Sequence, residues 1–166
     1  MEVSFLVRKF WPDDDAELAV SLAQRIRKDP NIDRGYFLGS GTWDWNRILY
    51  MEGELAGFFI ADFKNDEDVL QISTIITDPR FKAFNPFQLL MLTLETELEL
   101  VQKTGFKVEA VETLVSERDQ EMISTLKDYG FFLFRREPDA FSDEKNVTDG
   151  WVFRLGIKTI SDQASY

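Results

Sequence analysis

Apolar and polar positions in the first quarter of the chain predict a strand, a helix and a loop. Residues 5–10 alternate as a strand does, and apolar side chains then recur every three or four residues over 16–26, which is helical spacing. Pro12 and the three acids after it favour a helix that begins at Pro12 and ends near 28–30. Residues 31–46 have no such period and are predicted to form a loop.

The middle of the chain predicts a hairpin, a third strand and the longest helix. Strands over 47–51 and 55–63 flank a tight turn, and a strand over 69–77 follows. A short loop then leads to Asn85, an N-cap for a helix over 86–103 that has proline as its first residue. A strand that feeds a helix through such a loop directs backbone N–H groups at an anion bound over the turn.

The last third predicts three strands and one short helix. In chain order these are a strand over 106–115, a helix over 119–129, and two antiparallel strands over 131–136 and 151–158. Residues 159–166 are expected to be a frayed tail. The order of elements therefore predicts a mixed α/β sheet in a single domain that covers residues 1–158.

Composition removes several kinds of chemistry. The chain contains neither cysteine nor histidine, so a disulfide, a thiolate nucleophile, a Cys/His zinc site and a histidine base are all excluded. Proton transfer must use Asp, Glu, Tyr, Lys or solvent. No spacing typical of a calcium loop occurs, and no metal site is predicted.

Charge and hydropathy limit the partners. The net charge of −11 argues against general nucleic-acid binding, which needs Lys and Arg to neutralise phosphates. No apolar run approaches the roughly 18 residues of a membrane span, so no membrane partner is expected. The first residues lack the basic start of a signal peptide, and we expect the protein to be cytoplasmic.

Three segments carry a family resemblance. Residues 10–15 form a strand entering a helix, 54–61 contain a glycine in the strand after the hairpin, and 115–131 contain a late helix that ends in Gly-Phe. In this order and at this spacing around Pro79, they resemble the GNAT family of acyl-CoA-dependent N-acyltransferases. The resemblance covers nearly the whole chain and implies a GNAT-like α/β fold.

The resemblance also implies a cofactor and where it binds. In the family, acetyl-CoA lies against the strand that precedes the central loop, which here offers the backbone of Ile75, Ile76 and Thr77 to the pantetheine. The family then holds the pyrophosphate with the loop and the start of the next helix.

That loop departs from the family pattern. Its phosphate-binding positions fall on Lys82, Ala83, Asn85 and Phe87, so that only a positive charge at Lys82 survives and the expected glycines are missing. Pro86 removes one N–H donor from the helix start. Lys82 is either a phosphate contact or an ordinary surface lysine.

The catalytic positions depart as well. The resemblance places Ser73 where many relatives carry a glutamate base, and Leu126 where they carry a tyrosine acid. Leucine cannot donate a proton. Tyr129 lies three residues further along the same helix and is the candidate replacement, so Ser73 and Tyr129 are the candidate catalytic residues.

Two functions stay open. The first is a divergent N-acyltransferase that moves an acyl group from acyl-CoA to an amine. The second is a catalytically inactive GNAT-fold protein that binds a protein partner or a second copy, as a binding or structural component of a larger particle. The aromatic, glycine-rich segment 35–45 fits an acceptor pocket, a protein interface or plain core packing.

Overall fold

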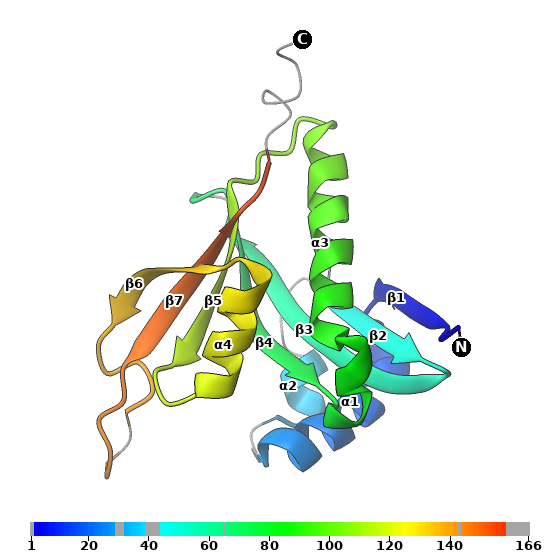
Figure 1. Ribbon diagram of the computed structural model, residues 1–166, viewed down its shortest axis with the longest axis horizontal. Helices are drawn as coiled ribbons and strands as arrows, with labels where there is room; N and C mark the ends of the chain where they lie inside the picture. Colours follow the sequence, from blue (N-terminus) through cyan, green and yellow to red (C-terminus); the bar gives the residue numbers. More distant parts are fainter. Residues whose placement is uncertain (1, 29–31, 39–43, 65, 143, 159–166) are drawn as a thin grey trace. The chain divides into compact units, whose positions relative to one another are not determined.

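The computed structural model describes residues 2–28, 32–38, 44–64, 66–142 and 144–158 (Figure 1). The chain forms two compact units. The first comprises residues 1–62 and 73–96, and the second comprises 63–72 and 97–166. The two strands at the boundary, β3 (Glu54–Lys64) and β4 (Val69–Thr77), contribute residues to both units.

The described strands belong to one mixed sheet. Their order is β1-β2-β3-β4-β5-β7-β6. Strands β1 (Phe5–Lys9) and β2 (Arg47–Met51) pair antiparallel with each other, and β2 pairs antiparallel with β3. Strand β4 pairs parallel with β5 (Ala110–Ser116), and β7 (Gly150–Gly156) lies antiparallel between β5 and β6 (Phe132–Glu137). The predicted α/β mixed sheet is confirmed.

The core of the first unit forms where helix α1 (Pro12–Arg27) packs on the strands. Ala16, Ala19 and Ala23 of α1 are almost fully buried in a cluster with Phe58 of β3 and Ile76 of β4. The small residues on this face of α1 permit close approach, and burial of the apolar stripe supplies most of the stability of such a helix.

A fully buried carboxylate fixes the start of α1. Asp15 is 1% exposed and accepts hydrogen bonds from the guanidinium of Arg8, the backbone N–H of Trp11 and the hydroxyl of Tyr50. Burial raises the pKa of Asp15, but the hydrogen bonds, above all that from Arg8, outweigh it and leave the pKa below its ordinary value.

The second unit is built on β5 and β7. Their register runs without a break from Ala110 opposite Gly156 to Ser116 opposite Gly150. Helix α4 (Gln120–Tyr129) buries Ile123 and Leu126 and lies beside β5 and β7 in Figure 1. The side chain of Asp119 caps α4 by accepting from the N–H of Met122.

Two sequence predictions need correction. Residues 31–46 were expected to be a loop, but a short helix, α2 (Arg34–Leu38), lies within them, since Asp33 accepts from the N–H of Tyr36 and starts the turn. The expected loop after β4 is a 3₁₀ helix, η1 (Pro79–Phe84), capped by Asp78. The tail at 159–166 and residues 39–43 of the aromatic segment lie outside the described residues.

Candidate functional site

The candidate site is the end of β4 and the turn into helix α3 (Pro86–Gln102), all in the first unit up to Thr96. The register of β4 with β5 covers Val69–Ile72, the first four of its nine residues. The N–H of Asp78 donates to the carbonyl of Ala56 on β3. Because successive residues of a strand direct their backbone groups to opposite edges, the groups of Thr77 and Ile75 face away from β3. This part of β4 thus presents a free edge.

One carbonyl of that edge is already bound. Arg27, the last residue of α1, donates from its guanidinium to the carbonyl oxygen of Ile75 at 2.8 Å. Ile75 and Ile76 are buried, whereas Thr77 is partly exposed. The side chains of this segment therefore belong largely to the core, and its backbone is the part that can meet a ligand.

Arginines gather where β4 ends. The carboxylate of Asp78 is 1% exposed and accepts from Arg25 at 2.9 Å and from both the N–H and the guanidinium of Arg80. Burial raises the pKa of Asp78, but these hydrogen bonds, with those from Arg80 foremost, bring it below its ordinary value. Both guanidinium groups are about half exposed.

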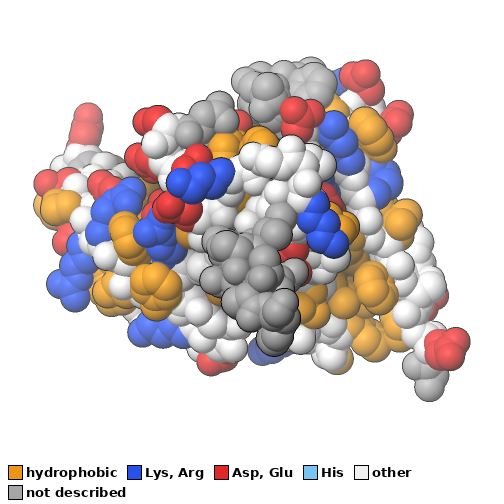
Figure 2. Space-filling model, turned by 90° about the horizontal axis from the view of Figure 1, so that it is seen from above, with side chains coloured by type: hydrophobic (Ala, Val, Ile, Leu, Met, Phe, Trp, Pro, Cys, Tyr) orange, Lys and Arg blue, Asp and Glu red, His pale blue; other side chains and the backbone are white. Residues whose placement is uncertain are grey.

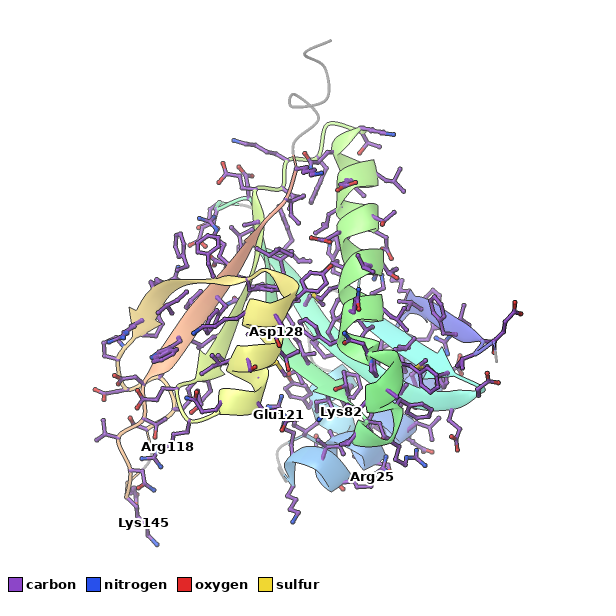
Figure 3. The ribbon with its side chains drawn as sticks, in the orientation of Figure 1. Arg25, Lys82, Arg118, Glu121, Asp128 and Lys145 are labelled. Atoms are coloured by element: carbon purple, nitrogen blue, oxygen red, sulfur yellow. The ribbon has the colours of Figure 1, made fainter. Side chains whose placement is uncertain are left out.

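Lys82 adds a further positive charge at this end. Figure 3 shows Arg25 and Lys82 where β4 leads into α3. Together with Arg27, four basic side chains stand here against the carboxylate of Asp78 and the nearby Glu54. A local excess of positive charge is notable in a protein whose net charge is −11, and it suits an anionic ligand. On the face seen in Figure 2, charges of both signs are interspersed.

The start of α3 is closed by its own residues. Asn85 accepts from the N–H of Gln88 through its side chain and has a positive φ of 49°. Phe87 is 5% exposed, whereas Phe84 is 48% exposed. The predicted cap at Asn85 is confirmed. Lys82 and Ala83 are exposed, so of the predicted phosphate-binding positions Phe87 is the one whose side chain is committed to the core.

Two hydroxyl side chains, Ser73 and Thr74, lie along β4 before Ile75, and a third hydroxyl, that of Tyr36 on α2, meets Thr74 there. Ser73 is exposed and donates to the carbonyl of Ile60 at 3.3 Å. Thr74 shares a hydrogen bond of 2.5 Å with the hydroxyl of Tyr36 on α2. The ring of Tyr36 packs edge-on against the fully buried Phe37. The sequence singled out Ser73 and missed the Tyr36–Thr74 pair, because α2 was read as a loop.

The second unit contains the other predicted catalytic residue. Tyr129 is partly buried near the end of α4 and packs against Phe131. Leu126 is fully buried, so the position where the family pattern has an acid is a core position here. Ser73 belongs to the first unit and Tyr129 to the second.

A buried charge in the second unit was not predicted. Glu112 of β5 is 3% exposed, and its carboxylate lies 3.6 Å from Arg154 and 3.8 Å from Arg135. The guanidinium of Arg154 lies over the ring of Phe134, 4.4 Å from its centroid. A glutamate within a largely apolar strand is the sequence signal for this group, and it is a weak one.

Within the described part of the chain, no cluster of three or more acidic side chains is arranged to hold a metal ion. No described helix is long and apolar enough to cross a membrane.

No protein-family model matches the sequence, and no curated protein matches it in sequence. Solved structures do match it in fold. The ribosomal-protein-S18-alanine N-acetyltransferase from Escherichia coli superposes with a TM-score of 0.76 at 19% identity, covering 94% of this chain and 96% of its own. NAA60 from Arabidopsis thaliana, solved in complex with a bisubstrate analogue, gives 0.73 at 15% identity over 93% and 99%.

An acetyltransferase of the GNAT family from Streptococcus pneumoniae gives a TM-score of 0.66 at 18% identity, covering 93% of this chain and all of its own. The chain therefore has the GNAT acetyltransferase fold across nearly its full length, as its sequence predicted. Likeness at this level of identity establishes the fold, and function has to be argued from the site.

Proposed function

We propose that the protein is an acyl-CoA-dependent N-acyltransferase that transfers an acetyl or related acyl group to an amine. The observation that carries the proposal is the free edge of β4 next to a basic cluster. Five residues of β4 extend past the register with β5. Arg80 and Lys82 follow in η1, and Arg25 of α1 reaches the same end of β4 through its ion pair with Asp78. An extended ligand with amides at one end and phosphates at the other matches both features.

Acyl-CoA is such a ligand. Its pantetheine arm carries amides that suit the backbone of Ile75–Thr77, and its phosphates suit the basic cluster near Lys82 and Ala83. The bisubstrate analogue bound by NAA60 is consistent with a two-substrate site in this fold. A cytoplasmic setting and a single domain over residues 1–158 are part of the proposal.

In this proposal most of the rate acceleration comes from positioning the amine against the thioester. The amine attacks the thioester carbonyl, the C–N bond forms, the C–S bond breaks, and the amine proton is passed through solvent to the departing thiolate. Holding the two reactants in line supplies several kcal/mol on its own. We propose Ser73 and the Tyr36–Thr74 hydroxyl pair as groups that orient the amine, and Tyr129 as the candidate acid that would give its proton to the thiolate and regain one from the solvent that took up the amine proton.

Acetyl-CoA binding tests the proposal. A ligand that binds the folded state raises the melting temperature by mass action, so millimolar acetyl-CoA should raise it in the wild type. Lys82→Ala should weaken binding roughly fivefold, the effect of one solvent-exposed charged hydrogen bond. Lys103→Ala changes an exposed lysine that directly follows the last residue of α3; it is the matched control and should bind as the wild type does.

Turnover is measured by release of the CoA thiol in the presence of amine probes such as an alanine-terminated peptide and spermidine. The chain has no cysteine, so thiol reagents see CoA alone. Absence of any shift in melting temperature at millimolar acetyl-CoA would remove the enzyme proposal.

The alternative function is a non-catalytic GNAT-fold protein that binds a protein partner or itself. Two observations favour it: Asn85 caps α3 with its own side chain, and Phe87 is buried where the family pattern has a small residue. This alternative predicts a partner or an oligomer. A protein that stays monomeric in light scattering and enriches no partner in pull-downs would count against it.

A further inference from the structure

Arg27 holds a backbone group that an incoming ligand needs. We propose that Arg27 competes with the pantetheine arm of acyl-CoA for the carbonyl of Ile75, and that this competition sets the affinity of the β4 edge. The inference rests on the proposed function and deepens it, because it names the residue of this chain that opposes cofactor binding.

The geometry of β4 gives the first step. The pairing of β4 with β5 ends at Ile72. The N–H of Asp78 donates to the carbonyl of Ala56 on β3. Alternation then directs the carbonyl of Ile75 to the free edge. An extended ligand that adds to this edge must donate an N–H to that oxygen, as a neighbouring strand would.

The chemistry of the contact gives the second step. Of the three arginines near the end of β4, Arg25 and Arg80 bind the carboxylate of Asp78, whereas Arg27 binds a neutral carbonyl at 2.8 Å. A hydrogen bond from a charged donor to a neutral carbonyl is weaker than a charge pair. Arg27 is also exposed at the end of its helix, so water can replace the lost contact.

The position of Arg27 in the chain gives the third step. Helix α1 ends at Arg27, and Lys28 after it has a positive φ of 53° and donates its N–H to the carbonyl of Gln24. The helix end therefore fixes the backbone of Arg27, whereas its long side chain is fixed by the hydrogen bond to Ile75. Release of the guanidinium changes side-chain rotamers and leaves the fold in place.

Selectivity follows from this arrangement. A ligand displaces Arg27 only if it brings an amide N–H to Ile75, which pantetheine does and a bare nucleotide does not. Removal of the Arg27 donor should therefore strengthen pantetheine and CoA binding by about fivefold, the value of one such hydrogen bond. Binding of 3′,5′-ADP, which has the phosphates and lacks the amides, should be unchanged.

The test compares wild type with Arg27→Met, which keeps the apolar stem and removes the donors. Calorimetric titration with CoA, and ligand-observed NMR with pantetheine and with 3′,5′-ADP, give the three affinities. Arg34→Met is the matched control, since Arg34 lies in the same unit and forms an exposed ion pair with Glu17. Arg27→Lys keeps the positive charge and separates its loss from that of the guanidinium contact.

The outcomes separate the role of Arg27 from the proposed binding of acyl-CoA. Tighter CoA and pantetheine binding in Arg27→Met with 3′,5′-ADP unchanged supports the inference. Equal CoA affinity in wild type and variant, or weaker binding of both CoA and 3′,5′-ADP that Arg27→Lys restores, overturns it and leaves the proposed function standing. No binding of CoA or pantetheine to either protein removes the proposed function and the inference together.

Discussion

Arg8 and Asp15 meet through two parallel hydrogen bonds of 2.8 Å each, between β1 and the first turn of α1. The guanidinium of Arg8 also lies over the ring of Tyr50, 5.2 Å from its centroid, and Tyr50 donates to the same carboxylate. The carboxylate is fully satisfied although it is 1% exposed. This network ties the N-terminal strand, the first helix and β2 together.

Asp15→Asn should destabilise the protein by about 2–4 kcal/mol, because it removes the charge from a buried pair and leaves Arg8 without its partner. Arg8 is partly solvated, which places the loss at the lower part of the range for buried pairs. Asp14→Asn, at an exposed position one residue away, is the control and should change stability by less than about 0.5 kcal/mol. Urea unfolding at pH 7 measures both; equal midpoints would contradict the role of Asp15.

Stability should fall steeply in acid. The pKa values of Asp15 and Asp78 are lowered in the folded protein, so the unfolded chain binds protons first. Their contribution is complete above the unfolded value near 3.9 and is lost as pH falls through the lower folded values. Melting temperatures between pH 7 and pH 2.5 should drop most below about pH 4.

The same scan with Asp15→Asn and Asp78→Asn identifies the groups responsible. In each variant the fall in melting temperature below about pH 4 should be smaller than in the wild type, because one of the two carboxylates that take up a proton on unfolding has been removed. An acid limb identical to that of the wild type in both variants would assign the transition to other carboxylates.

Sequence patterns located most elements to within a few residues. Strands 47–51 and 69–77 were predicted at their observed bounds, and Pro12 and Pro86 begin α1 and α3 as expected. These elements have strong local signals: proline in the first turn of each helix, the tight turn after residue 51 that ends β2, and the β-branched run of β4. Strand β5 begins at Ala110, four residues later than predicted, because apolar residues before a strand do not by themselves define its pairing.

The site was predicted only in part. The position of the turn after β4 follows from local sequence, and so does the cap at Asn85, which is confirmed. The assignment of Ile75 and Lys82 to a cofactor site came from the family resemblance and stays a prediction. The contacts of Arg27 with Ile75 and of Tyr36 with Thr74 join residues 48 and 38 positions apart. No local period encodes such pairs, and the same holds for Glu112 with Arg154.

The two ends of β7 provide a matched test of packing. A Cβ added at Gly150 would lie 2.6 Å from Leu114 and 2.9 Å from Ala140, whereas one added at Gly156 meets nothing within 4 Å. Gly150→Ala should therefore cost about 1–3 kcal/mol through overpacking, and Gly156→Ala should be close to neutral. Thermal unfolding of both variants measures this, and equal losses would show that backbone effects dominate instead.

The Tyr36–Thr74 hydrogen bond should couple α2 to β4. Tyr36→Phe and Thr74→Val should each cost about 1 kcal/mol, and the double variant should cost less than their sum, since the second change removes a partner already lost. Chemical denaturation of the four proteins closes the cycle. Strict additivity would mean that the two hydroxyls do not stabilise each other. Acetyl-CoA affinity should be unchanged throughout, because neither group lies on the free backbone edge assigned to the cofactor.

Leu126→Tyr tests whether a tyrosine can act as an acid at the position that the sequence resemblance assigns to one. Leu126 is fully buried, and its carbonyl accepts from the N–H groups of Gly130 and Phe131. A tyrosine at this position overfills the core under α4 and buries a hydroxyl, so we expect a loss of about 1–3 kcal/mol. That corresponds to a fall of several degrees in melting temperature.

No rise in CoA thiol release should accompany Leu126→Tyr, because a side chain held in the core cannot reach a reacting sulfur. Leu126→Met is the control, since it conserves volume and should cost less than about 1.5 kcal/mol. A stable Leu126→Tyr protein with faster thiol release would mean that α4 can turn this position toward the substrate, and that the loss of the acid is a matter of one side chain. A destabilised variant with unchanged turnover would instead mean that the packing of α4 prevents a tyrosine at residue 126 from acting as an acid.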